Sequence, residues 1–182
     1  MQVFKRLSAP RSHWLKTPIA SKSFCPWLIN NGSLTQRLQS ASGQFSVKKI
    51  RHGNGRPALD EAFLLGMRPQ QQALIREVQL CCAGVPVVFA HSVLPYKSLR
   101  GKWRDLGRLG NKPLGGALFA DFNVRRSPLE FKKLPRHHAL YKRAMAGLGA
   151  QKPDLWARRS IFSLKGASIM VTEVFLPQVL GL

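Results

Sequence analysis

Two pairs of β-rich segments, each pair joined by a short turn, constrain the fold of this chain more than any other feature. The segment ALIREVQLCCAGVPVVFAHSVLP contains two such runs around CAGVP, where Gly84 suits a tight turn. The segment ARRSIFSLKGASIMVTEVFLP contains another two, on either side of Lys165 and Gly166. Hydrophobic, β-branched runs separated by so few residues are typical of antiparallel hairpins. We therefore expect an antiparallel sheet that includes these four strands.

The remaining segments add helices and further strands. Ser33 in NNGSLTQRLQSASG is a suitable helix N-cap, and Gln36 follows three residues later as a capping-box partner. GQFSVKKIRHG alternates as a half-exposed strand does. Strands dominate and helices lie between groups of them, which is the pattern of an α+β protein. A chain of 182 residues suffices for a single domain with a substantial core.

Two segments are distinguished by their positive charge. Residues 1–12 contain no acid, and we expect a basic, flexible N-terminal segment there. Residues 132–154, KKLPRHHALYKRAMAGLGAQKPD, are predicted to form a basic surface excursion with one short helix. The domain itself is expected to span residues 13–182.

The net charge of the whole chain indicates which classes of partner it could bind. Lys and Arg number 29 against 8 Asp and Glu, which gives a formal net charge of +21. Such a balance is typical of proteins that bind nucleic acid or acidic membranes, and it also fits an enzyme that attracts small anions. No RRM, KH or zinc-finger pattern occurs and the basic residues are dispersed, so nucleic-acid binding is the weaker alternative. No run approaches 18 apolar residues, so no membrane span is predicted.

One acid and one base lie where charge is costly. Glu173 shares strand parity with Val171 and Phe175, and Arg76 shares parity with Val78. A charged group on a packed face must be paired or hydrogen-bonded. The two residues therefore form either a structural buried ion pair or a pocket that binds an anion carrying a hydroxyl or a labile proton.

Other chemistry-bearing patterns are weak in this sequence. It has no HExxH, Walker A, GxGxxG or GxSxG motif, so metalloprotease, nucleotide-binding and triad-hydrolase functions are unsupported. His137 and His138 are adjacent and so do not share a helix face, while His91 could face the pocket. Three cysteines without a CxxC spacing indicate neither a disulfide framework nor a metal site, and a reducing cytoplasm is the simplest location.

Five sequence blocks occur in an informative order. They are WLINNGSLTQRL, FSVKKIRHG, REVQLCCAGVPVVFAHSVLP, LGNKPLGGALF and LWARRSIFSLKGASIMVTEVFLP. In combination they resemble the bacterial chorismate pyruvate-lyases over roughly residues 13–131 and 155–177. The resemblance implies a cofactor-independent lyase, without a metal, that converts chorismate to 4-hydroxybenzoate and pyruvate for ubiquinone biosynthesis. It also implies a cytoplasmic monomer with helices on one side of the sheet and helical flaps covering an internal ligand site.

The family's substrate-contacting residues can be carried over position by position. Its two charged residues fall on Arg76 in IREVQL and Glu173 in VTEVFLP. Leu114 in KPLGG matches a position whose backbone lines the site, and Leu34 in GSLTQRL matches a hydrophobic flap residue. Arg76 and Glu173 are thus expected to be catalytic, and all four residues to bind the substrate. His91 departs from the pattern, because some relatives have an arginine there.

One further alternative comes from fold likeness. The effector domains of some bacterial transcription regulators resemble the lyase fold, and fold does not fix function. A non-catalytic module that binds aromatic acids is therefore the second hypothesis.

Overall fold

The computed structural model describes residues 13–101, 103–108, 112–119, 121–149 and 154–182. The predicted flexible segment 1–12 lies outside the described residues, as do residues 150–153 of the basic excursion.

Strands and short helices alternate along the described chain. The strands are β1 (Phe45–Gly55), β2 (Ala73–Cys82), β3 (Val85–Pro95), β4 (Arg125–Arg126), β5 (Glu130–Leu134), β6 (Leu155–Leu164) and β7 (Ala167–Phe175). The α-helices are α1 (Cys25–Leu28), α2 (Leu34–Ala41), α3 (Leu59–Leu64), α4 (Tyr96–Leu99), α5 (Leu114–Phe119) and α6 (Ala139–Met145). Three 3-10 helices are η1 (Lys22–Phe24), η2 (Arg104–Arg108) and η3 (Pro177–Gly181).

The strands form one antiparallel sheet, as expected. Its order is β1-β2-β3-β7-β6-β4, and β5 also pairs with β6. Both predicted hairpins are confirmed, since β2 pairs with β3 and β6 pairs with β7. Their two-residue turns have positive φ angles at Ala83, Gly84, Lys165 and Gly166, which matches the twist of the strands. Contact between β3 and β7 joins the two hairpins at the centre of the sheet.

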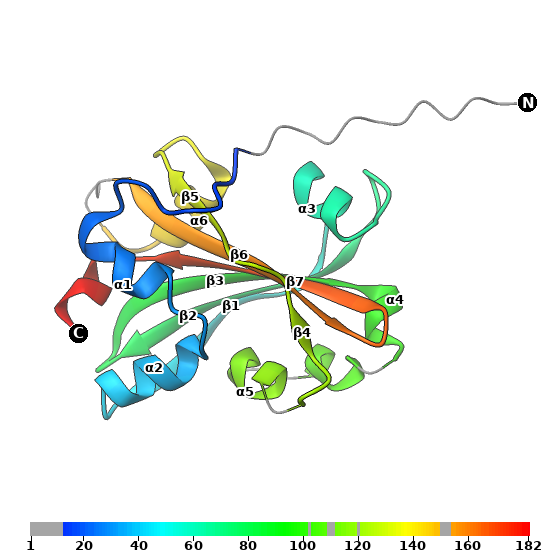
Figure 1. Ribbon diagram of the computed structural model, residues 1–182, viewed down its shortest axis with the longest axis horizontal. Helices are drawn as coiled ribbons and strands as arrows, with labels where there is room; N and C mark the ends of the chain where they lie inside the picture. The colour runs from blue at the N-terminus through cyan, green and yellow to red at the C-terminus, as the bar shows by residue number, and fades with distance from the viewer. Residues whose placement is uncertain (1–12, 102, 109–111, 120, 150–153) are drawn as a thin grey trace, which may run out of the picture.

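Short helices cover one face of this twisted sheet, which we call the α2 face. In Figure 1, α2 and α5 lie below the strands, and α1 lies at the left-hand end of the sheet. Ser33 caps α2 as predicted, because its side chain accepts a hydrogen bond from the backbone N–H of Gln36 at 3.3 Å. Two separate hydrophobic clusters bind these helices to the sheet. The first joins Trp27, Leu28, Leu34 and Leu38 to Val78, Val88 and Phe175. The second joins Leu114 and Leu118 to Phe162, Ile169 and Val171.

The opposite face, the α6 face, is also covered by helices. Leu140, Tyr141 and Ala144 of α6 pack against strand residues of alternate parity, such as Phe89 and Val174. α3 packs beside them in a fourth cluster. The α+β class is confirmed, but the expectation of helices on one side needs correction. The strands are buried on both faces because both carry apolar residues at alternating positions.

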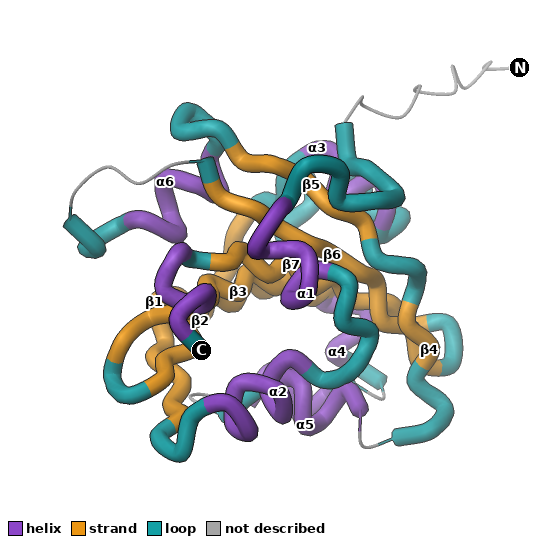
Figure 2. The backbone as a smooth tube through the Cα atoms, turned by 60° about the vertical axis from the view of Figure 1, so that its left-hand side comes forward, coloured by secondary structure: helices purple, strands orange, loops and turns teal. Residues whose placement is uncertain are grey.

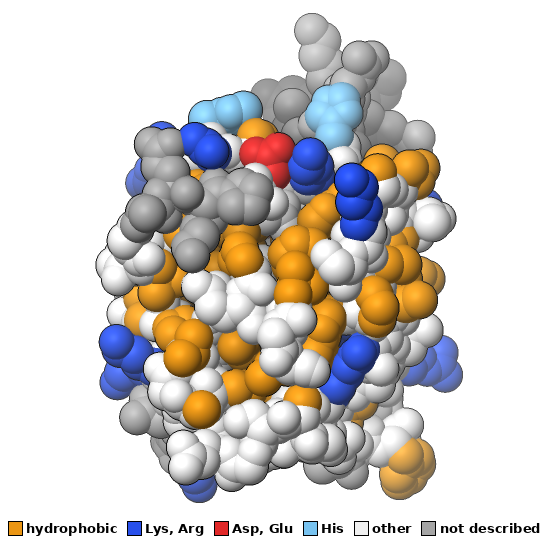
Figure 3. All heavy atoms as spheres, turned by 90° about the vertical axis from the view of Figure 1, so that its left-hand side faces the viewer, with side chains coloured by type: hydrophobic (Ala, Val, Ile, Leu, Met, Phe, Trp, Pro, Cys, Tyr) orange, Lys and Arg blue, Asp and Glu red, His pale blue; other side chains and the backbone are white. Residues whose placement is uncertain are grey.

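The segment 132–154 is more integrated than a surface excursion. Its first residues belong to β5, which pairs along β6 from Glu130 to Leu134. The predicted short helix exists as α6, and its apolar side is buried. The basic side chains of this segment that are exposed include Lys133, Arg136 and Lys142. Elsewhere Lys and Arg are scattered over the surface, as Figure 3 shows for one side of the molecule.

A network of charged side chains is buried on the α6 face, around His91. The Nδ1 atom of His91 lies 2.9 Å from Glu77 Oε1, and its Nε2 atom lies 3.3 Å from Glu61 Oε1. Arg143 of α6 donates a hydrogen bond to the same Glu77 oxygen at 2.8 Å. Burial disfavours the charged imidazole, but hydrogen bonds to Glu61 and Glu77 outweigh it and raise the pKa of His91. The network therefore ties α3 and α6 to the central strands.

Within the described residues, no helix has the length and apolar character needed to cross a membrane.

The pH dependence of stability should reveal the His91 network. Because the pKa of His91 is raised in the folded state, its stabilising charge is fully present below the unfolded value of about 6.5 and is lost as pH rises through the folded value. We expect the free energy of unfolding, measured by urea titration, to fall from pH 6 upward. His91→Gln should be less stable at pH 6 and should lack this decline. As a control, His137→Gln, at an exposed position, should behave like the parent protein. If the free energy of unfolding of His91→Gln had the same pH dependence as that of the parent, the assignment would be contradicted.

Candidate active site

A pocket lies on the α2 face, at the boundary between its two hydrophobic clusters. It spans about 520 Å³, mouth included, and its floor is formed by β2, β3, β7 and β6. Residues from α2, from α5 and from the loops before them cover it. All four residues predicted from the sequence line this one pocket: Leu34, Arg76, Leu114 and Glu173.

Arg76 lies on β2 at one side of the pocket. Its side chain is almost fully buried, and its Nη2 atom donates a hydrogen bond of 2.7 Å to the carbonyl of Lys112. Lys112 lies two residues before the first residue of α5, so this contact holds the start of the covering helix against the sheet. Burial lowers the pKa of Arg76 from its usual value, although an arginine stays protonated at neutral pH.

Glu173 lies on β7, two strands from Arg76. Its Oε2 atom accepts a hydrogen bond of 2.5 Å from the Nε atom of Arg158 on the neighbouring strand β6. Arg158 and Glu173 are directly opposite each other in the antiparallel register, so both side chains point to the same face. The ion pair shown for Glu173 is therefore with Arg158, whereas the sequence suggested Arg76. Fifteen per cent of the Glu173 side chain remains exposed, toward the pocket, while Arg158 is wholly buried.

Arg158 also holds the segment that leads into the covering helix α2. Its Nη1 atom donates to the carbonyls of Trp27 and Leu28 at 3.2 Å, and to that of Asn30 at 2.6 Å. Trp27 and Leu28 are the last two residues of α1 and Asn30 comes after it, so these carbonyls have no hydrogen-bond partner within the helix. One guanidinium thus joins the pocket carboxylate to the base of the α2 cover.

α2 and α5 meet above the pocket, and a glycine allows them to approach closely. A Cβ atom at Gly115 would lie 2.8 Å from the Thr35 Oγ1 atom and 3.4 Å from the Ser33 Oγ atom. Figure 2 shows the two helices side by side, facing the sheet. Leu34 and Leu114 project from these helices and are both more than nine-tenths buried. The cover thus presents these two leucines, together with Thr35, to the cavity above the charged groups.

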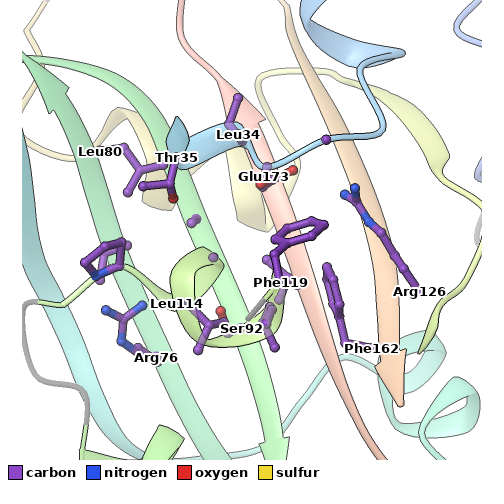
Figure 4. Close-up of a pocket in the computed structure, with 17 residues that line it drawn as sticks. Leu34, Thr35, Arg76, Leu80, Ser92, Leu114, Phe119, Arg126, Phe162 and Glu173 are labelled. Atoms are coloured by element: carbon purple, nitrogen blue, oxygen red, sulfur yellow. The ribbon is translucent and has the colours of Figure 1, made fainter. Parts of the chain in front are cut away.

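Arg126 is a pocket residue that the sequence analysis missed. It belongs to β4, on the other side of Glu173 from Arg76, and lies near Phe119 and Phe162 (Figure 4). The available signal was the pair of RRS tripeptides, at 125–127 and 158–160. Adjacent strand residues point to opposite faces, so each pair of arginines must place one on the α2 face. Those arginines are Arg126 and Arg158.

His91 does not reach this pocket, contrary to the expectation that it could. It pairs with Thr172 and Glu77 across the sheet, both of which point to the α6 face, while its neighbour Ser92 lines the pocket. The alternation of strand side chains decides this placement.

Fold and pocket together are those of a single-domain α+β protein with a covered pocket, lined by two arginines and one glutamate, between a sheet and two short helices. The family model for chorismate lyase matches residues 10–181. A protein of Methylobacillus flagellatus, named "Probable chorismate pyruvate-lyase", is 48% identical over 172 residues, which cover 94% of this chain and 97% of that one. One of the same name from Nitrosospira multiformis is 48% identical over 96% of this chain and 98% of its own length. The chain belongs to the chorismate lyase family.

Solved structures resemble this one in fold at low sequence identity. The effector domain of PhnF from Mycobacterium smegmatis matches with a TM-score of 0.55 and 16% identity, over 81% of this chain and 90% of that one. The C-terminal domain of the histidine utilization repressor from Pseudomonas syringae matches with a TM-score of 0.55 and 9% identity, over 74% and 93% of the two chains. These likenesses confirm the fold class.

Stability should depend on the geometry of Arg158 and not only on its charge. Arg158→Lys keeps the charge, but an ammonium cannot reproduce the planar fork that reaches both Glu173 and the α1 carbonyls. We expect the variant to be about 1–3 kcal/mol less stable, because buried carbonyls and a carboxylate lose partners. Urea denaturation would measure the loss, with Arg125→Lys, at an exposed site, as the control. Equal stability of the two variants would contradict this account.

Proposed function

We propose that this protein is a chorismate pyruvate-lyase that converts chorismate into 4-hydroxybenzoate and pyruvate. One observation carries the proposal: in a member of the chorismate lyase family, Arg76 and Glu173 line the same covered, largely apolar pocket. Neither a surface patch nor an open groove would exclude water in this way.

The reaction needs little chemistry from the protein. The bond from ring carbon 3 to the enolpyruvyl oxygen breaks, and ring carbon 4 loses its hydrogen. The three-carbon fragment gains that hydrogen and leaves as pyruvate, while the ring becomes aromatic. Atoms balance without a co-reactant, and aromatisation drives the step forward. The site must therefore hold the reactive conformer and stabilise the charge that develops on the parting fragments.

Arg76 and Glu173 take complementary roles in this proposal. The Arg76 guanidinium binds the ring carboxylate through a charge-assisted pair. Glu173 accepts a hydrogen bond from the ring hydroxyl, which becomes more acidic as the phenol forms, so the interaction strengthens during the reaction. Arg158 keeps the Glu173 carboxylate oriented toward the pocket.

Leu34 and Leu114 complete the site from above. In the proposal they pack against the ring and, with α2 and α5, must move aside for substrate entry and product release. A monomeric enzyme is part of this proposal. Supply of the ubiquinone ring in the cytoplasm is the role that we propose for the product.

A binding domain without catalysis is the second candidate, favoured by the fold shared with the PhnF effector domain. Incubation of the purified protein with chorismate separates the two. A lyase releases equal amounts of 4-hydroxybenzoate and pyruvate, measured by chromatography. Binding of chorismate without release of either product would overturn the lyase assignment.

Substitutions at the two charged positions should have different effects. Glu173→Gln keeps the size of the side chain but removes its negative charge, so turnover should fall far more than substrate binding. Arg76→Ala should weaken binding as well as turnover, because the carboxylate contact is lost. Single-turnover assays beside thermal melts measure both properties. A Glu173→Gln variant that is destabilised by about 3–5 kcal/mol but fully active would show a purely structural role for the residue.

Exposed positive charge of the segment 132–154 should affect capture of substrate and not chemistry. Replacing Lys133, Arg136 and Lys142 together by Gln removes charges that lie outside the pocket. We expect an unchanged kcat and a weaker salt dependence of kcat/KM, since long-range attraction of dianionic chorismate is reduced. Loss of activity at saturating chorismate would place this segment in the active site.

A further inference from the structure

Arg126 is the second cation of the pocket, and the roles given to Arg76 and Glu173 leave it without a function. It lines the cavity from β4, and its partial burial there lowers its pKa from the usual value. Placing a guanidinium in such a site costs free energy unless it is paired. Nearby Glu173 offsets part of this cost, but Glu173 already forms its ion pair with Arg158.

The hydrogen bonds of Arg126 leave donors available for a ligand. Its Nε atom donates to the Ser160 Oγ atom at 2.9 Å, and its Nη1 atom donates to the carbonyl of Asn31 at 2.9 Å. A guanidinium has five N–H donors, so these two bonds do not exhaust it. They fix the side chain between the sheet and the loop before α2, while the aromatic rings of Phe119 and Phe162 lie 5.7 and 5.2 Å from its Cζ atom.

The order of strands places the three charged residues in sequence across the pocket. Arg76 is on β2, Glu173 on β7 and Arg126 on β4, and the sheet order is β2-β3-β7-β6-β4. Neighbouring strands are about 4.8 Å apart, so the strands of the two arginines are each roughly 10 Å from that of Glu173. Figure 4 shows the same arrangement, with Arg76 and Arg126 at opposite sides of the cavity.

The proposed substrate has a matching arrangement of charge. Chorismate is a dianion, with one carboxylate on ring carbon 1 and the other on the enolpyruvyl group. If Arg76 holds the ring carboxylate and Glu173 faces the hydroxyl on carbon 4, the enolpyruvyl ether on the adjacent carbon 3 projects sideways from the ring next to that hydroxyl, from the half of the ring that is remote from Arg76. That is the side of the pocket where Arg126 lies.

We propose that Arg126 binds the enolpyruvyl carboxylate of chorismate and is the residue that distinguishes the dianionic substrate from the monoanionic aromatic product. This assignment rests on the proposed function and deepens it. Arg126 holds the three-carbon fragment while its bond to the ring breaks, and 4-hydroxybenzoate makes no contact with it. Release of 4-hydroxybenzoate therefore does not require any contact with Arg126 to break.

The test compares substrate and product on Arg126→Gln. We expect kcat/KM for chorismate to fall roughly 10- to 100-fold, the size of a lost charge-assisted hydrogen bond. The dissociation constant for 4-hydroxybenzoate, measured by calorimetry, should change by less than about threefold. Arg126→Lys, which keeps the charge, should recover part of kcat/KM. The matched control is Arg125→Gln, which removes the same charge from the neighbouring exposed position and should leave both quantities unchanged.

Three results would overturn the inference. If Arg126→Gln keeps kcat/KM for chorismate, the residue does not bind the substrate. If the substitution weakens the binding of 4-hydroxybenzoate as much as it lowers kcat/KM for chorismate, Arg126 acts by holding the Asn31 loop and not by recognising the second carboxylate. If Arg125→Gln has the same effect, only the overall charge matters. Failure of the lyase proposal itself is separate, because the unsubstituted protein would then make no 4-hydroxybenzoate.

Discussion

The buried guanidinium of Arg158 is the interaction on which the rest of the site depends. It lies on β6 with no exposed surface, and it bonds at once to the Glu173 carboxylate and to three backbone carbonyls around the end of α1. Without it, the carboxylate would be buried beside apolar residues at a large desolvation cost, and the loop before α2 would lose its attachment to the sheet. The position of the α2 cover and the orientation of the Glu173 carboxylate therefore have a common physical cause.

Charge is distributed over the two faces of the sheet for different purposes. On the α6 face, His91, Arg143 and Arg159 pair with carboxylates, and the pairs attach α3 and α6 to the strands. On the α2 face, Arg158 bonds to Glu173 and to backbone carbonyls through its Nε and Nη1 atoms, while Arg76 and Arg126 line a cavity. The first arrangement stabilises the fold. The second has the features of a site prepared for an anion, since preorganised donors in a water-excluded cavity act strongly on charge.

The separation of stabilising ion pairs on the α6 face from a pocket on the α2 face explains how lyases and regulator domains can share one fold. The hairpins, their turns and the two-sided burial define a scaffold that is independent of what the pocket contains. Function resides in a few side chains on the central strands and in the helices that close over them. A formal charge of +21, which first suggested nucleic acid, is scattered over the surface and also suits the attraction of a dianion.

Local sequence patterns were enough to predict the antiparallel sheet, both hairpins, the Ser33 cap and the location of Arg76 and Glu173 on a packed face. These follow from local rules: turn residues with positive φ, alternation along a strand, and the cost of a charge on an apolar face. The sequence did not reveal that Arg158 is the ion-pair partner of Glu173, that Arg126 lines the pocket, or that His91 lies on the α6 face. Each of those depends on which strands are neighbours and in what register, and residues 15 to more than 100 positions apart in the chain meet there. Strand pairing is a long-range property, so the charges that share a face, and those that share a pocket, are known once the neighbouring strands and their register are known.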